Sequence, residues 1–461
     1  MFGWPAVCLM LFLALPLEVA AISSLLGGYM LLPSGMQIDL PLLPPLDKMS
    51  ITAITTLLLC WMKGPQVWHP RQSIFIYLFG LAFFVSPILT SLNNSYELQT
   101  AKESIPGFYP LDGLKIAGRN LLMLVPFHIG SRFLSSEKAR LLLLKALTAA
   151  AVVYSLPMLF ELRMAPQLHQ WIYGYFPNDA FSQQIRGAGW RPVVFFEHGL
   201  ALALFTALTF TAAVVLVRLR TKVLRVPASL IAPYLGMMVL ACKSLGPVLY
   251  AAVAAPLVLF TRPRTWVKIA CAACLIVCIY PALRTNGLAP TQIVSNLANK
   301  VSPERNRSFQ TRLMNEEQLL TKAEQKPFFG WGTWGRNRVY DKDTGKDITI
   351  TDGGWIIQFG TFGWFGYLAL FGLLASAAFQ PLRAVAGNIT PASVSLAALT
   401  LLLGIYVVDQ VPNANPFALT LLIAGSVATA GRARAPRGAS RTTAAKILHR
   451  AAPAGAMADF G

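Results

Sequence analysis

The stretch PFFGWGTWG, residues 327–335, decides the fold because it joins two segments of opposite character. Before it runs a charged segment, SFQTRLMNEEQLLTKAEQK at 308–326, and after it an apolar run, GWIIQFGTFGWFGYLALFG, begins at Gly354. An apolar run of roughly 20 residues is long enough to cross the hydrocarbon core of a bilayer. The sequence therefore predicts a large polar loop that leads into a membrane helix.

Composition extends this prediction to the whole chain. Of the 461 residues, 55% are hydrophobic and only 13% are charged, and the mean hydropathy is +0.54. Soluble domains carry about 25% charged residues. We therefore expect an all-α, polytopic integral membrane protein, because a helix satisfies its own backbone polar groups in lipid. About twelve spans are expected, at 4–25, 48–61, 74–92, 114–133, 141–162, 192–217, 227–242, 246–260, 267–281, 354–379, 392–408 and 412–429.

These spans divide the chain into four parts. Residues 1–284 would form about nine membrane helices, and residues 354–430 about three more. Residues 285–353 between them would form one large extracytoplasmic loop that includes an amphipathic helix. Residues 431–461 are rich in Ala, Arg, Pro and Gly, which predicts a disordered, basic, cytoplasmic tail. The two short spans on either side of Lys243 could instead form a single broken hairpin in the membrane.

Basic residues indicate the orientation of the predicted spans. Lys and Arg in short loops stay on the cytoplasmic side, and the basic clusters all fall on one side if twelve spans alternate from a cytoplasmic N-terminus. This places both termini in the cytoplasm and the loop at 285–353 outside. The clusters are Lys63 and Arg71; Arg132, Lys138 and Arg140; Arg218, Arg220, Lys222 and Arg225; Arg262, Arg264 and Lys268; and the tail from Arg432 to Arg450.

Three patterns that suggest other functions have plainer interpretations. The net charge of +19 lies mostly in cytoplasmic loops and tail that face anionic lipid headgroups, so we expect the lipid bilayer, and no nucleic acid, as a partner. Residues 1–21 lack a basic n-region, which favours a retained helix over a cleaved signal. Cys271, Cys274 and Cys278 share one helical face without His or carboxylate beside them, which predicts packing. We expect no metal and no cofactor.

Charged residues gather at the outer ends of the predicted spans. Arg186 and Arg191 precede the span at 192–217, and Glu197 and His198 lie one to two turns inside it. Ionisable residues within a span are costly unless they line a polar cavity, so Glu197 and His198 are candidate catalytic residues. The alternative is an interfacial ion pair of Glu197 with an arginine that only anchors the helix.

Two further places could bind phosphate. Lys243 stands at the outer end of the short hairpin, where it could contact a phosphate or snorkel to lipid headgroups. Arg305, Arg307 and Arg312 gather at the start of the amphipathic helix predicted at 308–326. Because a helix N-terminus is already positive, cations concentrated there favour a bound phosphate or pyrophosphate. A solvated surface helix is the alternative.

The glycine and aromatic run offers contacts of another kind. Trp331 and Trp334 present flat apolar faces of the type that stack on sugar rings, and Arg336 follows them directly. These three residues are candidate glycan contacts. Asp352 stands just before the apolar helix that begins at Gly354, where it could serve as the N-cap.

In this order, the residues resemble the O-antigen ligase and O-antigen polymerase superfamily of bacterial inner-membrane proteins. The resemblance follows an Arg-bearing segment, an amphipathic helix, PFFGWGTWG, a loop, and GTFGWFG within an apolar helix. It covers most of the chain by topology, and its specific residues lie between Arg186 and Gly366. RGAG at 186–189 fits less closely, as does Lys243-Ser244, where relatives often have Ser-Arg-Gly.

The resemblance implies a metal-independent, membrane-embedded glycosyltransferase of the GT-C type in the bacterial inner membrane. Its donor would be a glycan on undecaprenyl pyrophosphate at the outer leaflet. Arg186, Lys243 and Arg312 would hold the pyrophosphate, with Arg191 beside them. Such an enzyme would polymerise lipid-linked repeat units into exopolysaccharide or O-antigen, alongside other assembly proteins such as a flippase and a chain-length regulator.

The general base is left open among Asp352, Glu197 and His198. Relatives on the ligase branch commonly have a His near the start of the helix after the large loop, where this chain has TDGG at 351–354. We therefore rank a polymerase above a ligase, which would transfer the glycan to a lipid or protein acceptor. A transporter of lipid-linked oligosaccharides is a further alternative, disfavoured because no internal repeat is evident, and a purely structural or assembly role is another.

Overall fold

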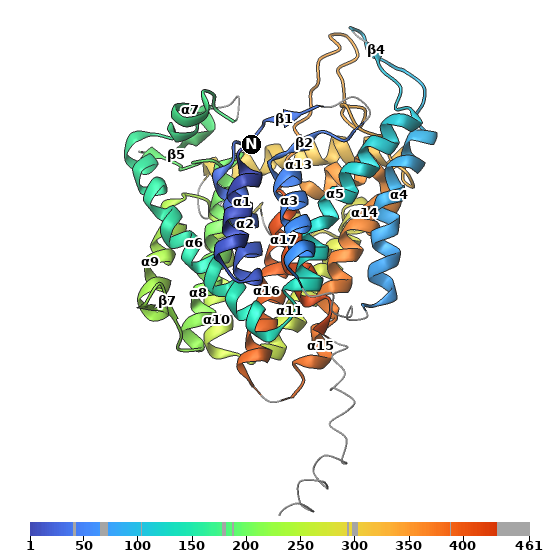
Figure 1. Cartoon of the computed structure of the whole chain (residues 1–461). Helices are drawn as coiled ribbons and strands as arrows, with labels where there is room; N and C mark the ends of the chain where they lie inside the picture. Colours follow the sequence, from blue (N-terminus) through green and yellow to red (C-terminus); the bar gives the residue numbers. More distant parts are fainter. Residues whose placement is uncertain are drawn as a thin grey trace, which may run out of the picture.

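The computed structural model describes residues 1–39, 43–64, 72–102, 104–177, 181–186, 189–292, 295–296, 303–387 and 389–430, with side chains from Gln310 onward in the helix that begins at Pro303. Most of these residues are helical, and the helices run side by side as a bundle (Figure 1). Six helices in the described ranges are long and apolar enough to cross a membrane, as expected for a helical membrane protein; the number of twelve spans stays a prediction. They are Ile74–Leu92, Glu137–Met164, Gly199–Arg218, Pro263–Thr285, Gly354–Ala384 and Pro391–Asp409.

The elements follow one another in a simple order. The helices are α1 (Trp4–Ala14), α2 (Leu17–Leu31), α3 (Lys48–Lys63), α4 (Ile74–Leu92), α5 (Pro110–Phe133), α6 (Glu137–Met164), α7 (Leu168–Tyr173), α8 (Gly199–Arg218), α9 (Ala228–Ala241), α10 (Leu245–Phe260), α11 (Pro263–Thr285), α13 (Pro303–Glu324), α14 (Gly354–Phe379), α15 (Pro381–Ala384), α16 (Pro391–Asp409) and α17 (Ala418–Val427). Short antiparallel hairpins lie in the connections: β1–β2 (Gln37–Ile38 and Leu46–Asp47), β3–β4 (Leu98–Gln99 and Ser104–Ile105), β5–β6 (Ile185–Arg186 and Gly189–Trp190) and β7–β8 (Lys222–Val223 and Val226–Pro227).

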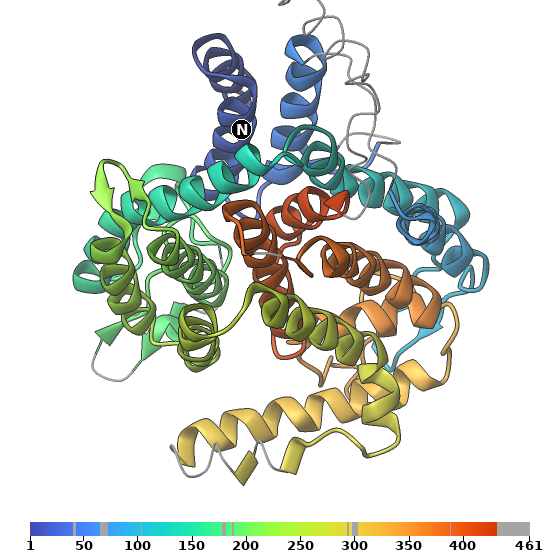
Figure 2. The same cartoon turned by 90° about the horizontal axis from the view of Figure 1, so that it is seen from below.

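Burial follows hydrophobicity within the bundle. The apolar helices α8, α14 and α16 are buried over most of their length, as expected for helices that are hydrophobic all round. Figure 2 shows α14, α16 and α17 in the middle of the bundle, with α13 running crosswise along one edge. α13 is amphipathic, since Leu319, Leu320 and Ala323 are buried while Glu317 is exposed.

The predicted first span, 4–25, is wrong, because two helices occupy it. The chain is extended at Pro16, between α1 and α2, where a residue without N–H cannot continue a helix. α2 then runs back beside α1, so that Trp4 packs over Gly27: a Cβ on Gly27 would lie 2.8 Å from the Trp4 ring. The turn between the helices rests against Lys63, which ends α3 and donates hydrogen bonds to the carbonyls of Phe12, in the last turn of α1, and of Leu15.

This hairpin changes the placement of the chain's first residues. Trp4 lies at the end of the bundle where α3 begins and α13 runs (Figure 1). The last turn of α17 lies at the other end, where the Ser426 hydroxyl donates to the carbonyl of Leu134, just after α5. The described chain therefore begins at the α13 end of the bundle and reaches residue 430 at the opposite end, while the predicted cytoplasmic placement of the two termini stays a prediction.

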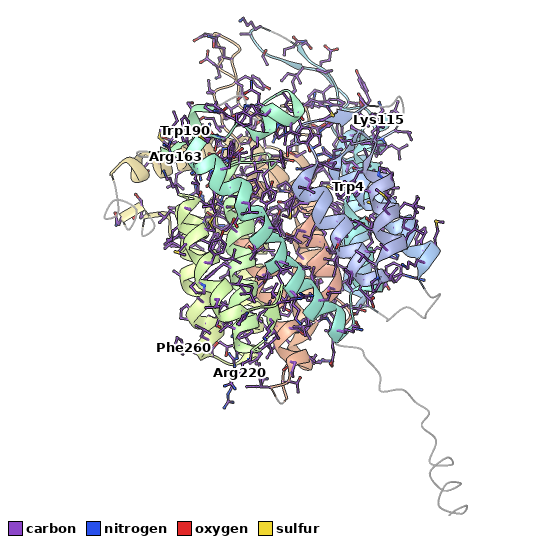
Figure 3. All side chains as sticks on the ribbon, turned by 60° about the vertical axis from the view of Figure 1, so that its left-hand side comes forward. Trp4, Lys115, Arg163, Trp190, Arg220 and Phe260 are labelled. Atoms are coloured by element: carbon purple, nitrogen blue, oxygen red, sulfur yellow. The ribbon has the colours of Figure 1, made fainter. Side chains whose placement is uncertain are left out.

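The basic clusters do gather at one end of the bundle, the end away from α13. Figure 3 shows Arg220 there, with Arg163 and Trp190 at the opposite end. The predicted members Arg71 and Arg432 to Arg450 lie outside the described residues. Members that end or begin helices at this end are Lys63, Arg132, Arg218 and Arg262.

The PFFGWGTWG stretch is fixed to a break in α14. Gly363 has φ +60° and ψ −165° and interrupts the helix there. Four backbone hydrogen bonds of 2.7 to 3.1 Å join residues 327–332 to residues 360–365. A Cβ on Gly363 would lie 2.4 Å from the carbonyl carbon of Phe328, so only glycine permits this approach. The loop is thus anchored to the membrane helix by its own backbone.

Candidate functional site

One wall of the site is formed by the β5–β6 hairpin and the turn between α9 and α10. Arg186 ends β5 and pairs with Gly189 of β6, while Lys243 stands in the α9–α10 turn with φ +51°. The Lys243 Nζ donates to the Arg186 carbonyl oxygen at 3.2 Å. A Cβ on Gly189 would lie 2.6 Å from that Nζ. Glycine at 189 therefore lets the lysine reach the hairpin.

Arg191 is the buried member of the site, with only 3% of its surface exposed. No described residue accepts a hydrogen bond from its Nε or Nη1, and the side-chain amide of Gln184, which is fully buried, has no described partner either. Burial lowers the pKa of Arg191 to about 10, and the charges of Arg186 and Arg312 act in the same direction. A buried charge costs several kcal/mol unless it is compensated. Arg191 is therefore a candidate anion-binding residue.

Arg312 brings α13 into the same site. Its Nε lies 3.2 Å from Oδ2 of Asp352, just before α14, and its Nη1 donates to the Pro412 carbonyl at 3.4 Å. Its charge also lowers the pKa of both Arg191 and His198. Arg186, Arg191, Lys243 and Arg312 are named the cation cluster below. The side chains of Arg305 and Arg307 lie outside the described residues.

His198 closes the cation cluster on the side of α8. Its Nδ1 accepts the N–H of Leu200 at 3.0 Å, and its Nε2 lies 3.1 Å from Oε1 of Gln183. An oxygen acceptor at Nε2 requires the proton there, so the ring is the neutral Nε2–H tautomer. Burial lowers the pKa of His198 to about 4, and the arginines of the cluster lower it in the same sense. Both ring nitrogens are engaged in this structure, and the role of His198 as general base stays a prediction.

Glu197 lines a different space, a cavity of about 400 Å³ inside the bundle that we name the central cavity. The Glu197 side chain is accessible to solvent, and desolvation by the groups packed around it raises its pKa. Asp47 raises it further, whereas Lys48 and Arg119 oppose the shift. Other polar side chains in the wall are Asn120, Gln358, Thr361, Gln410 and Asn415.

Buried side chains hold the turn that carries Glu197 and His198. The Glu161 carboxylate of α6 accepts the N–H groups of Val193 and Val194, each at 2.8 Å. The Lys48 Nζ donates to the Phe195 carbonyl at 3.2 Å. Val194 has φ +53°, a strained value for a β-branched residue that persists only when its surroundings fix it.

Sequence reasoning missed Glu161 and Lys48 as part of the site. Each is a charged residue near the end of a predicted span, at 141–162 and 48–61. A charge in that position was the available signal, because such residues are expensive in a membrane protein and mark polar interiors. Both side chains are almost completely buried.

The structure does not bring the three predicted glycan contacts to the cation cluster or the central cavity. Trp331 is buried, with the Lys322 Nζ 3.8 Å from its ring centre. Arg336 is fully buried and donates hydrogen bonds to three backbone carbonyls. Both side chains therefore help to hold the loop together, and their predicted contact with a glycan stays a prediction. Trp334 is 51% exposed.

The remaining predictions concern the start of α14 and the cysteines. Asp352 lies in the site but points to Arg312, and no side-chain cap is formed at α14, whose N-cap residue is Gly353. Cys271, Cys274 and Cys278 are buried within α11, against the core of the bundle. Among the described residues, no group of three His, Cys, Asp or Glu is placed to hold a metal ion.

Neither a protein-family model nor a curated protein matches this chain.

Proposed function

We propose that this chain is a polysaccharide polymerase, which transfers a glycan from a polyprenyl pyrophosphate to the end of a second lipid-linked glycan. The observation that carries the proposal is Arg191, a buried guanidinium with two nitrogens that no described residue accepts from, within a cluster of four cations. A pyrophosphate supplies the charge and the oxygen acceptors that such a cluster lacks. Undecaprenyl pyrophosphate is the donor that the sequence resemblance implies.

The cation cluster would act on the leaving group. Transfer breaks the bond between the anomeric carbon and the pyrophosphate oxygen, and the polyprenyl pyrophosphate departs with the electron pair. Arginine and lysine donors already in place stabilise charge that develops there, which is commonly the largest contribution to catalysis. The neutral His198 beside them adds no charge of its own and caps α8.

Glu197 is the base that fits best. The oxygen of the acceptor hydroxyl attacks the anomeric carbon, and its proton passes to the Glu197 carboxylate. A raised pKa brings a carboxylate closer to the operating pH and makes it a stronger base, and Glu197 has such a pKa. Glu197 and His198 are consecutive, so the acceptor side and the donor side of the reaction meet on one turn.

A lipid-linked acceptor also fits the space around the central cavity. An apolar groove of about 630 Å³ lies between α3, α4 and α5. Leu122 lines both the groove and the central cavity, and Ile54 of the groove follows Ala53 of the cavity. The polyprenyl chain of an acceptor would occupy the groove while its glycan enters the cavity toward Glu197.

The outer face of a bacterial inner membrane is the location that accords with this reaction. Basic residues of short loops stay in the cytoplasm, and they gather at the end of the bundle away from α13. The cation cluster lies at the α13 end, which would then face outward, where a polymerase receives its lipid-linked substrates.

The proposal is tested with the purified protein in lipid discs, given the undecaprenyl-pyrophosphate repeat unit of its host. We expect a ladder of lengthened glycans, lost by at least about 100-fold in Arg191→Ala and Arg312→Ala, since removing one such donor typically costs that much. Arg264→Gln, an exposed change at the opposite end of the bundle, should leave the ladder unchanged.

Other outcomes separate the alternatives. A single transfer to an added lipid core or protein would identify a ligase. Movement of the glycolipid across a sealed bilayer without any transfer would identify a transporter and end the proposal. Normal ladders from both arginine variants would remove the pyrophosphate site.

A further inference from the structure

A second cavity of about 400 Å³ lies outside the bundle, between α13, the β3–β4 hairpin and the chain that follows PFFGWGTWG. Figure 1 shows the hairpin and this part of the large loop rising beyond the ends of the helices. The cavity shares no described lining residue with the central cavity, and we name it the outer cavity. Polar and basic members of its wall are Gln99, Lys322, Gln325, Arg336, Arg338 and Lys342.

The wall of the outer cavity is strongly basic. Lys322, Arg336, Arg338 and Lys342 face one acidic residue among the described lining, Asp341. The Asp341 Oδ1 is already bound within its own turn, where it accepts from the backbone N–H groups of residues 343 and 344 and from the Thr344 hydroxyl. One cation of the wall, Arg338, is neutralised by Asp347, outside the lining, at 2.7 Å. The other basic side chains leave the cavity positive.

Arg336 gives an independent indication that an anion belongs here. Its side chain is fully buried, and three backbone carbonyls take up Nε and Nη1, yet no described residue accepts from Nη2. The neighbouring Lys322 has a lowered pKa, first because of burial and then because of the charges of Arg336 and Lys326. A buried cation surrounded by further cations is unfavourable without an opposite charge.

We propose that the outer cavity binds an acidic sugar, a hydroxylated ring with a carboxylate, in the glycan that this enzyme handles. The inference that this sugar is part of a glycan rests on the proposed function. The basic residues would take the carboxylate, and the amides of Gln99 and Gln325 the hydroxyls. The volume is within the range of ligand sites, roughly 300 to 1,000 Å³.

The position of the outer cavity favours a sugar over a lipid headgroup as its ligand. Much of the wall of the outer cavity, in the β3–β4 hairpin and at 338–342, lies on segments that extend beyond the helix ends, whereas headgroups lie at the level of those ends. A bound sugar there would hold the glycan outside the membrane while its end occupies the central cavity. The enzyme would consequently prefer repeat units that carry an acidic sugar.

The test measures binding directly, by calorimetry on the intact protein in lipid discs. The probes are hexagalacturonate, neutral maltohexaose of the same length, and sodium phosphate. We expect hexagalacturonate to bind at least about 10-fold more tightly than maltohexaose, and the double variant Lys322→Gln, Lys342→Gln to lose about 10-fold of that affinity. Lys346→Gln is the matched control, an exposed lysine of the same loop that does not line the cavity.

Further variants keep the result interpretable. Lys342→Gln alone changes an exposed side chain and should weaken binding about 3-fold even if a Lys322 variant fails to fold. Equal affinity for both hexasaccharides, or unchanged affinity in folded variants, overturns the inference. Full competition by phosphate at equal concentration would mean an adventitious anion only.

Binding and transfer can fail separately. Arg312→Ala should abolish transfer and leave hexagalacturonate affinity unchanged, because Arg312 does not line the outer cavity. Binding without any transfer in the wild type would refute the polymerase and keep the sugar site. A ladder of lengthened glycans without any hexagalacturonate binding would refute the sugar site and keep the polymerase.

Discussion

Arg312 and Asp352 form an ion pair between α13 and the start of α14, with Nε 3.2 Å from Oδ2. Both side chains are about one-third exposed, at 32% and 36%, so the pair contributes little to stability. Its main effect is on the site: the Asp352 carboxylate faces a cation of the cluster and does not line the central cavity. Asp352 therefore does not share the cavity that Glu197 lines.

Asp352→Asn should retain transfer within about 3-fold of the wild type. The change removes a negative charge beside Arg312 and leaves that guanidinium to the pyrophosphate, so donor affinity should be equal or greater. Initial rates at saturating and at low donor concentration check both parts. A loss of 100-fold in kcat would instead make Asp352 the base.

Glu197→Gln should lower kcat by at least about 100-fold, the usual contribution of general base catalysis, with donor affinity unchanged. The wild-type rate should fall on the acidic side as Glu197 takes up a proton, at a pH above that of an ordinary glutamate because its pKa is raised. A pH profile of kcat checks this, and Glu197→Asp should keep the acidic limb at a reduced rate. If the Glu197→Gln variant kept the wild-type decrease of kcat at acidic pH, a group other than Glu197 would be responsible for that decrease.

Glu316 of α13 should make stability depend on pH. Burial raises its pKa to about 7, although the Trp355 N–H and Arg284 oppose the shift. Between the unfolded and folded pKa values the folded chain keeps a proton that the unfolded chain has lost, so stability falls as pH rises from 4.5 to 7.

Glu316→Gln should flatten this dependence and stabilise the protein at pH 8 by at most about 3 kcal/mol, a limit set by 1.36 kcal/mol per pKa unit. Thermal unfolding in detergent from pH 5 to pH 8 measures it. Glu317→Gln is the control, since Glu317 is adjacent and exposed. A Glu316→Gln protein with the wild-type pH slope would contradict the assignment.

Gly363→Ala should destabilise the protein by at least about 2 kcal/mol, because a Cβ there meets Phe328 backbone at 2.4 Å and the residue has φ +60°. Gly80→Ala is the matched control: Gly80 lies in α4 with nothing within 4 Å of the added Cβ. That change should be neutral or stabilising by up to about 1 kcal/mol. Chemical denaturation in detergent compares the two.

Cysteine labelling should reveal the α1–α2 hairpin. With an impermeant maleimide, a cysteine at Phe2 should react from the same side of the membrane as one at Lys346, and from the opposite side to one at Arg264. The native cysteines are all buried, so background labelling should be low. If cysteines at Phe2 and Arg264 reacted from the same side of the membrane, the result would support a single first span.

The sequence predicted the helical membrane architecture because apolar runs of span length are a strong signal. It did not reveal the α1–α2 hairpin, since a Pro within an apolar run permits either a kink or a turn, and packing of Trp4 on Gly27 decides. The structure places Arg186 and Arg191 at the β5–β6 hairpin, Lys243 in the α9–α10 turn against it and Arg312 on α13, and phosphate binding by these cations stays a prediction. Trp331 and Arg336 turn inward because their side-chain N–H groups donate to the carbonyls of Lys322 in α13, Trp331 in the loop and Tyr96 before β3.

The hydrogen bonds that hold residues 193–195 have a consequence for substrate affinity in the proposed enzyme. Glu161 and Lys48 fix this turn in the folded protein before any substrate arrives. Glu197 and His198 therefore need no ordering on binding, and a protein that is already in its competent conformation binds at its full intrinsic affinity. In the proposed reaction the strain at Val194 would be compensated once, when the chain folds, and each turnover would begin from an assembled site.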